Sequence, residues 1–251
     1  MLVFIGISAG LLSGAFGVGG GIIIVPLLVA FAGLDQKQAA ATSLLAILPT
    51  AIAGSITYLA NGEVDYVAAA FIAAGAIVGA FIGAALLKRI PIAVLRWLFI
   101  GMLVVVAVRM FFEDPVRGEP LTLTPLLAVA YVALGLVMGI AAGLLGVGGG
   151  IIAVPALVSL FGISDLVAKG TSLLVMIPTT VSGTLRNRSS GFVQVRTGLV
   201  VGAAAAVASV GGAYVALTIP AKAASVAFAV FLVVIAIHLT LRAIAAHRTK
   251  G

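Results

Sequence analysis

The most informative stretch of this chain is the glycine-rich run Gly-Val-Gly-Gly-Gly-Ile-Ile-Ile-Val-Pro at residues 17–26. A second copy, Gly-Val-Gly-Gly-Gly-Ile-Ile-Ala-Val-Pro, occupies residues 146–155, which is 129 residues further along. At this offset the flanking sequence also matches without a gap, with 24 identities in the 57 positions from 6 to 62. Identity of this extent predicts a duplicated unit, one copy in each half of the chain.

The composition places both copies in a membrane. Of the 251 residues, 63% are hydrophobic and 8% are charged, and the mean hydropathy is +1.34. Soluble domains carry about 25% charged residues, so a soluble protein, a disordered chain and a disulfide-rich secreted module are excluded. We therefore expect an all-α integral membrane protein. The net charge of +7 then belongs to cytoplasmic loops rather than to a nucleic-acid site.

Apolar blocks separate into two sets of four. We identify them at residues 2–33, 39–60, 66–87, 92–112, 125–161, 168–185, 193–217 and 223–244. A spanning helix needs about 20 residues, so the first and fifth blocks are too long for one helix, and the glycine runs break them. We expect a first membrane repeat at 1–112, a linker at 113–124 and a second repeat at 125–251.

Basic residues indicate how the halves are oriented. If every block crosses the membrane once, the 14 Lys and Arg residues divide eight against six between the two sides. If the first and fifth blocks instead enter and leave on one side, the side of the termini holds ten and the other side four. Cytoplasmic loops are enriched in Lys and Arg. The second arrangement is favoured, with inverted repeats and both termini in the cytoplasm.

The glycine breaks are candidate binding sites for an anion. Backbone groups freed within a membrane are tolerated only where protein or a wet cavity surrounds them. The helix that resumes after each break points its positive end and its bare N–H groups at that place. We predict substrate contacts from both breaks, at Gly17, Gly19, Gly20, Gly21, Gly146, Gly148, Gly149 and Gly150. The alternative is a pair of kinks that allow helices to cross closely.

A second repeated element combines hydroxyl side chains with proline. Proline within a helix frees a carbonyl, which a hydroxyl can satisfy, or the hydroxyl can face a substrate. Both interpretations stay open for each of these residues: Thr42, Ser43, Pro49, Thr50, Thr171, Ser172, Pro178 and Thr179. Glycines spaced four apart, by contrast, predict close helix packing.

Charged residues are scarce inside the blocks. All seven carboxylates fall in loops or at block ends, which argues against a carboxylate proton relay or a cation site. We expect Lys169 to be a loop cation, and Arg109 and His238 to lie at the membrane interface. No catalytic constellation, metal cluster or nucleotide-binding motif is found, so neither an enzyme nor a cofactor is expected.

These motifs resemble a known family. Two copies of Gly-x3-Gly-x3-Gly followed by Gly-Val-Gly-Gly-Gly-Ile-Ile-x-Val-Pro, at residues 6–26 and 135–155, are similar to the sulfite exporter TauE/SafE family of membrane permeases. The resemblance implies a multi-pass protein of the prokaryotic inner membrane that transports a sulfur-containing anion such as sulfite or a sulfonate. A secondary anion transporter is thus our leading hypothesis. A passive anion channel and a permease for a non-sulfur anion remain alternatives.

Overall fold

The computed structural model describes residues 1–112 and 124–248, and over these residues the chain is helical with short connections. The helices are α1 (Leu2–Phe16), α2 (Gly21–Phe31), α3 (Gln36–Ala60), α4 (Tyr66–Leu87), α5 (Ile92–Phe112), α6 (Pro125–Leu145), α7 (Gly150–Ser159), α8 (Asp165–Arg188), α9 (Val195–Thr218) and α10 (Ala221–Arg248). The predicted linker, apart from Thr124, lies outside the described residues. Thr124 caps the first turn of α6 by accepting a hydrogen bond from the Leu127 N–H.

The all-helical membrane fold is confirmed. Five of the described helices are long and apolar enough to cross a bilayer, namely α3, α4, α6, α8 and α9. The predicted glycine breaks are confirmed too, because the first and fifth apolar blocks each form two helices separated by the glycine run. The four prolines of the repeated motifs lie inside helices α2, α3, α7 and α8.

The helices of the second half repeat the spacing of the first. Helices α2 to α5 begin at residues 21, 36, 66 and 92, and α7 to α10 begin at 150, 165, 195 and 221. Each therefore begins 129 residues after its counterpart. Contacts between α3 and α8 show that these counterparts run in opposite directions: Gly54 faces Leu173, Leu44 faces Gly183 and Tyr58 faces Gly170. Opposite directions for equivalent helices are what an inverted repeat requires.

The broken blocks form hairpins. A Cβ atom built on Gly20 would lie 2.9 Å from the Ala9 carbonyl oxygen, and one on Gly149 would lie 3.1 Å from the Met138 oxygen. Both partners lie inside the preceding helix, so the chain turns back toward α1 before α2 begins and toward α6 before α7 begins. Each hairpin thus brings its glycine run into the interior.

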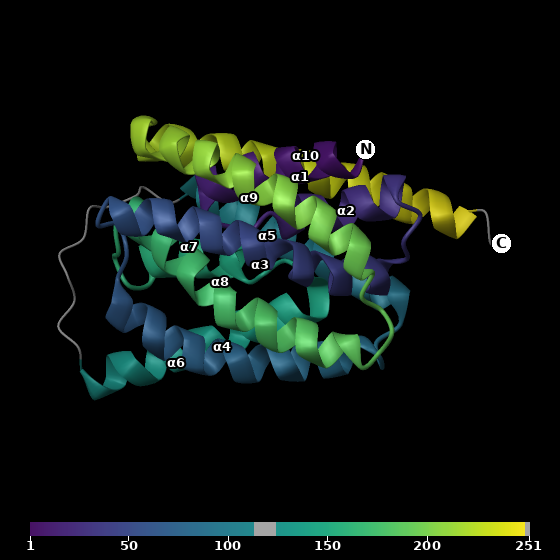
Figure 1. The fold of residues 1–251 in the computed structure, drawn as a ribbon, viewed down its shortest axis with the longest axis horizontal. Coiled ribbons are helices and arrows are strands. Elements are labelled where there is room, and N and C mark those ends of the chain that lie inside the picture. The colour runs from purple at the N-terminus through teal and green to yellow at the C-terminus, as the bar shows by residue number, and fades with distance from the viewer. Residues whose placement is uncertain (113–123, 249–251) are drawn as a thin grey trace.

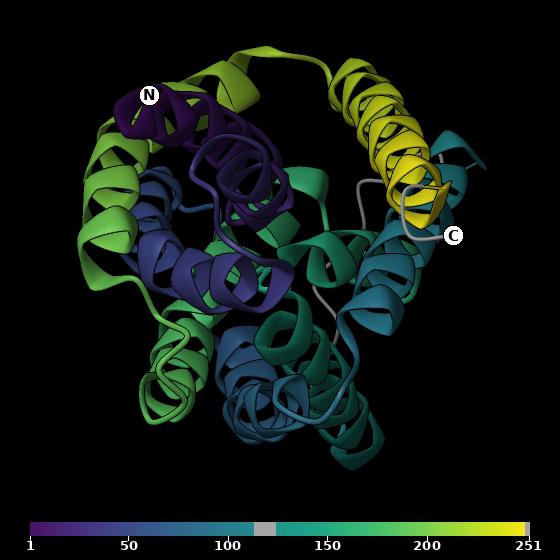
Figure 2. The ribbon, with the colours of Figure 1, turned by 90° about the vertical axis from the view of Figure 1, so that its right-hand side faces the viewer.

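The helices form layers around α3 and α8. Figure 1 shows α1, α9 and α10 along one edge of the molecule and α4 and α6 along the opposite edge. In the end-on view of Figure 2, α10 lies beside α5 at one corner, in agreement with the packing of this pair. The N-terminus and the C-terminal end of α10 both lie in the right-hand half of Figure 1.

Glycines allow two parallel helix pairs to pack with their backbones in contact. Helix α1 lies along α9, and α4 lies along α6. The closest approaches pair Gly6 with Val201, Gly10 with Ala205, Gly14 with Ser209, Gly75 with Val132, Gly79 with Leu136 and Gly83 with Ile140. Membrane helices associate by such close packing, because lipid gives no hydrophobic driving force between them.

Two neighbouring glycines of α9 test this packing. A methyl group at Gly212 would overlap the Leu11 carbonyl oxygen, whereas at Gly211 its nearest neighbour is Leu11 Cδ2 at 3.8 Å. We expect Gly212→Ala to lower the midpoint of thermal unfolding in detergent by about 2–12 °C, since overpacking costs about 1–3 kcal/mol. Gly211→Ala is the matched control and is expected to leave it unchanged or slightly higher. Equal midpoints for the two variants would contradict the packing.

Candidate functional site

Left-handed glycines shape each break. In the first break Gly17, Gly19 and Gly20 have φ of 67°, 76° and 72°. In the second, the equivalent glycines at 146, 148 and 149 have φ of 73°, 77° and 92°. Side chains with a Cβ rarely adopt this conformation, so the turn depends on glycine. Gly20 and Gly149 are the N-caps of α2 and α7, and each hairpin turns at this point.

The two breaks meet each other in the interior. A Cβ atom on Gly21 would lie against the Gly146 carbonyl oxygen and 2.6 Å from Val147 Cα. Reciprocally, a Cβ atom on Gly150 would lie 2.5 Å from the Gly17 carbonyl oxygen and 2.8 Å from Val18 Cα. The fold therefore brings together the eight glycines that were predicted to form a site, from segments 129 residues apart in sequence.

The breaks contain backbone donors without partners. Among the described residues, no hydrogen bond is made by the N–H groups of residues 18–22 or 147–151. All of these residues are buried. A buried N–H that lacks a partner is costly and rare in proteins. Here the unpaired donors lie at the N-termini of two helices, where partial positive charge collects.

Two apolar side chains fill the space between the breaks. Ile47 of α3 and Met176 of α8 are counterparts in the two halves, and both are fully buried. The Met176 sulfur would lie 3.2 Å from a Cβ atom on Gly148, and Ile47 packs against Gly19, Gly21 and Gly148. These two side chains therefore pack directly against the glycines of both breaks.

Two serines join the halves at the breaks. The Ser43 hydroxyl donates to the Gly146 carbonyl oxygen at 2.6 Å, and the Ser172 hydroxyl donates to the Gly17 oxygen at 2.9 Å. Each bond runs from one half to the break of the other, and both serines are fully buried. These serines hold the carbonyl groups at the start of each glycine run.

The threonines of the repeated element have structural partners as well. Thr42 accepts a hydrogen bond from the Gln194 N–H at 3.0 Å, and Thr171 accepts one from the Asp65 N–H at 2.9 Å, so each contacts the start of a helix in the other half. Thr50 and Thr179 donate to Ala46 and Val175 within their own helices. Pro49 contacts Gly202 of α9, and Pro178 is half-buried. A substrate role for these residues stays a prediction.

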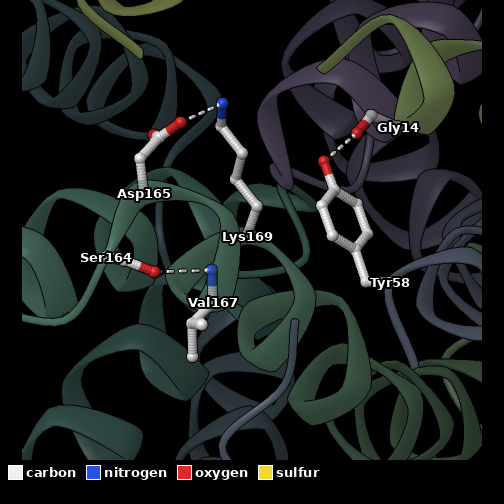
Figure 3. Close-up of polar contacts among 6 residues, drawn as sticks. All are labelled: Gly14, Tyr58, Ser164, Asp165, Val167 and Lys169. Atoms are coloured by element: carbon white, nitrogen blue, oxygen red, sulfur yellow. Dashed lines mark hydrogen bonds and ion pairs between the residues drawn. The ribbon is translucent and has the colours of Figure 1, made fainter. Parts of the chain in front are cut away.

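The expectation that Lys169 is a loop cation is wrong. Lys169 lies in the second turn of α8 with its side chain 3% exposed, and it forms an ion pair with Asp165 at 2.6 Å. Figure 3 shows this pair in the same region as the Tyr58 hydroxyl, which donates to the Gly14 carbonyl oxygen at 2.8 Å. A Cβ atom on Gly17 would lie 2.6 Å from Lys169 Cα, so the lysine packs directly against the first break.

A cavity lined in part by an arginine lies beside α2, in the first half of the chain. Its volume is about 230 Å³, and it is lined by Val25, Pro26, Val29, Gln36, Arg96, Phe99 and Leu239. It thus includes the proline of the repeated motif and a half-buried arginine of α5. Arg96 is one of the basic residues in the count above and lies inside the fourth apolar block. Its position within a helix was the signal that could have identified it.

Comparisons with known proteins agree with this architecture. The family model "Sulfite exporter TauE/SafE" matches residues 1–126 and 131–250. The chain is 30% identical to the probable membrane transporter protein YunE of Bacillus subtilis (strain 168) over 77% of its length and 79% of that protein. It is 26% identical to a probable membrane transporter protein of Haemophilus influenzae over 96% of its length and 98% of that protein. No solved structure matches the chain significantly. The protein belongs to the sulfite exporter TauE/SafE family and is a membrane transporter.

Proposed function

We propose that the protein is a secondary transporter for a small sulfur-containing oxyanion such as sulfite, which binds where the two glycine breaks meet. The observation that carries this proposal is the group of buried, unpaired N–H groups at residues 18–22 and 147–151. An oxyanion offers several acceptors to such donors, and the two helix N-termini stabilise its negative charge. The name of the family, sulfite exporter, and the description of the relatives as probable membrane transporters support a transporter of this class of anion.

An anion fits the charges near the breaks better than a cation. The carboxylates of Asp35, Glu63, Asp65 and Asp165 lie in loops or at the starts of helices. Two cations lie beside the breaks: Lys169, which is paired with Asp165, packs against Gly17, and Arg96 lines the cavity beside α2. A cation site within a membrane normally uses carboxylates or carbonyl groups, and the carbonyls of Gly17 and Gly146 each already accept a bond from a serine hydroxyl.

The arrangement supports alternating access around the breaks. We take the halves to be inverted repeats in the cell membrane, with the termini in the cytoplasm, where ten of the 14 basic residues then lie. The Arg96 cavity attracts the anion from that side. Ile47 and Met176 close the path between the breaks, and movement of one half against the other opens it to each side in turn.

Transport by the purified protein in proteoliposomes tests the proposal. We expect saturable uptake of sulfite or thiosulfate, stimulated by the same anion trapped inside, and much slower uptake of acetate. Counterflow distinguishes a carrier from a passive channel, which shows neither saturation at low concentration nor trans-stimulation. Uptake of a carboxylate in preference to every sulfur oxyanion would overturn the substrate class, and absence of uptake for all of them would overturn the function.

A further inference from the structure

One half of the molecule contains a buried ion pair that its counterpart lacks. Asp165 and Lys169 are one turn apart in α8, with side chains 11% and 3% exposed. The equivalent residues of α3, at the same offset of 129, are Gln36 and Ala40, which are buried as well. The chain thus provides its own comparison between a charged and a neutral version of the same site.

The neutral version shows that the fold does not need the pair. In α3 the helix start, the adjacent break at Gly146 and the serine contact to it are all formed with Gln36 and Ala40 in place. Removing an ion pair from water costs several kcal/mol per ion, and its mutual attraction rarely gives net stability. Charged groups within a membrane protein are, by default, functional candidates.

The position of the pair links it to the break. Lys169 Cα packs on Gly17, and the hydroxyl of Ser172, in the next turn, bonds the Gly17 carbonyl. The ammonium group reaches back along α8 to Asp165, toward the start of that helix. The loop from α3 to α4 packs on Gly170 through Glu63 and Val64. Glu63 itself is half-buried and its negative charge disfavours an anion, so Lys169 is the group of this region that can attract one.

We propose that Lys169 binds the transported anion in the second half only, and that the Asp165 carboxylate pairs with its ammonium group when no anion is bound. This inference rests on the proposed function and extends it. An anion that enters by the α3–α4 loop replaces the Asp165 carboxylate as the partner of the Lys169 ammonium. When the anion leaves, the carboxylate takes its place again. The other side of the break, with Gln36 and Ala40, has no such exchange.

Opposite effects of two substitutions test the exchange. The apparent Kd of sulfite is measured from the thermal stabilisation of the detergent-solubilised protein, at constant ionic strength. We expect Asp165→Asn to lower Kd by about tenfold and to slow maximal flux in proteoliposomes, because the freed ammonium retains the anion. Lys169→Ala is expected to raise Kd by about tenfold. Asp35→Asn removes an exposed carboxylate at the equivalent helix start, and it is expected to leave Kd unchanged.

The double variant Asp165→Gln with Lys169→Ala serves as the folding control, because it copies the residues of the first half. It is expected to unfold at the wild-type temperature and to bind sulfite several-fold more weakly. Shifts of Kd in the same direction for both single variants, or a wild-type Kd in the double variant, overturn the exchange alone. If sulfite, thiosulfate and sulfate all fail to stabilise the wild-type protein, the proposed function is overturned together with it.

Discussion

Alanine at Gly21 or Gly150 is expected to reduce sulfite transport on the order of 100-fold, because even small displacements at a binding site can have effects of this size. The added methyl group would overlap the carbonyl oxygen of the opposite break, at Gly146 or Gly17, and at Gly150 it would also displace the flexible end of Met176. Both glycines begin a helix with ordinary backbone angles, and alanine favours a helix over glycine by about 1 kcal/mol. The loss therefore comes from separation of the two breaks and not from a weaker helix.

Proteoliposome uptake measures this effect, with the amount of folded protein fixed by size-exclusion chromatography. Gly101→Ala is the matched control: this glycine is also helical, and no atom lies within 4 Å of a Cβ built on it. We expect wild-type transport in the control and similar losses in the Gly21 and Gly150 variants, because their contacts are reciprocal. Full activity of Gly21→Ala would show that the meeting of the breaks is not required for transport.

The glycine runs, the repeat and the membrane class could be predicted from the sequence because each depends on local composition. A run of glycines favours a turn, because glycine adopts the positive φ that these residues have. Its recurrence at a fixed offset marks equivalent positions in the two halves. The recurrence of Ser43 and Thr50 at the same offset marked both as members of the repeated element. It could not show that Ser43 reaches Gly146 in the other half, because that contact depends on how the halves pack.

The wrong expectation for Lys169, which lies in α8 and not in a loop, has a related cause. The sixth apolar block was bounded at residue 168, whereas α8 begins at Asp165, with Ser164 as its N-cap. An apolar pattern does not mark the first turn of a helix when that turn contains polar residues. A capping residue satisfies the first N–H groups there and lets the helix begin earlier. Lys169 consequently fell at the edge of a block when it belongs to a buried turn. The repeat comparison with Ala40 contained the useful signal, namely a charge in one copy only.

Removal of the serine contacts between the halves is the second large effect we expect. Ser43→Ala with Ser172→Ala leaves the buried carbonyl oxygens of Gly146 and Gly17 without their hydroxyl partners. Each loss is expected to cost about 1 kcal/mol of the free energy of unfolding, which corresponds to about 2–4 °C in the unfolding midpoint for a chain of this size. The released carbonyls also let each glycine run shift, so we expect transport to fall about tenfold.

Thr50→Val with Thr179→Val provides the comparison for the serine variant. These hydroxyls bond only carbonyls of their own helices among the described residues, and valine preserves the shape of the side chain. If the hydroxyls of the repeated element serve local helix geometry alone, both double variants will change the unfolding midpoint and the transport rate alike. If Ser43 and Ser172 couple the two halves, only the serine variant will lose transport. A third result, loss of transport in the threonine variant alone, would place the substrate near Thr50 and Thr179 rather than at the carbonyl ends of the breaks.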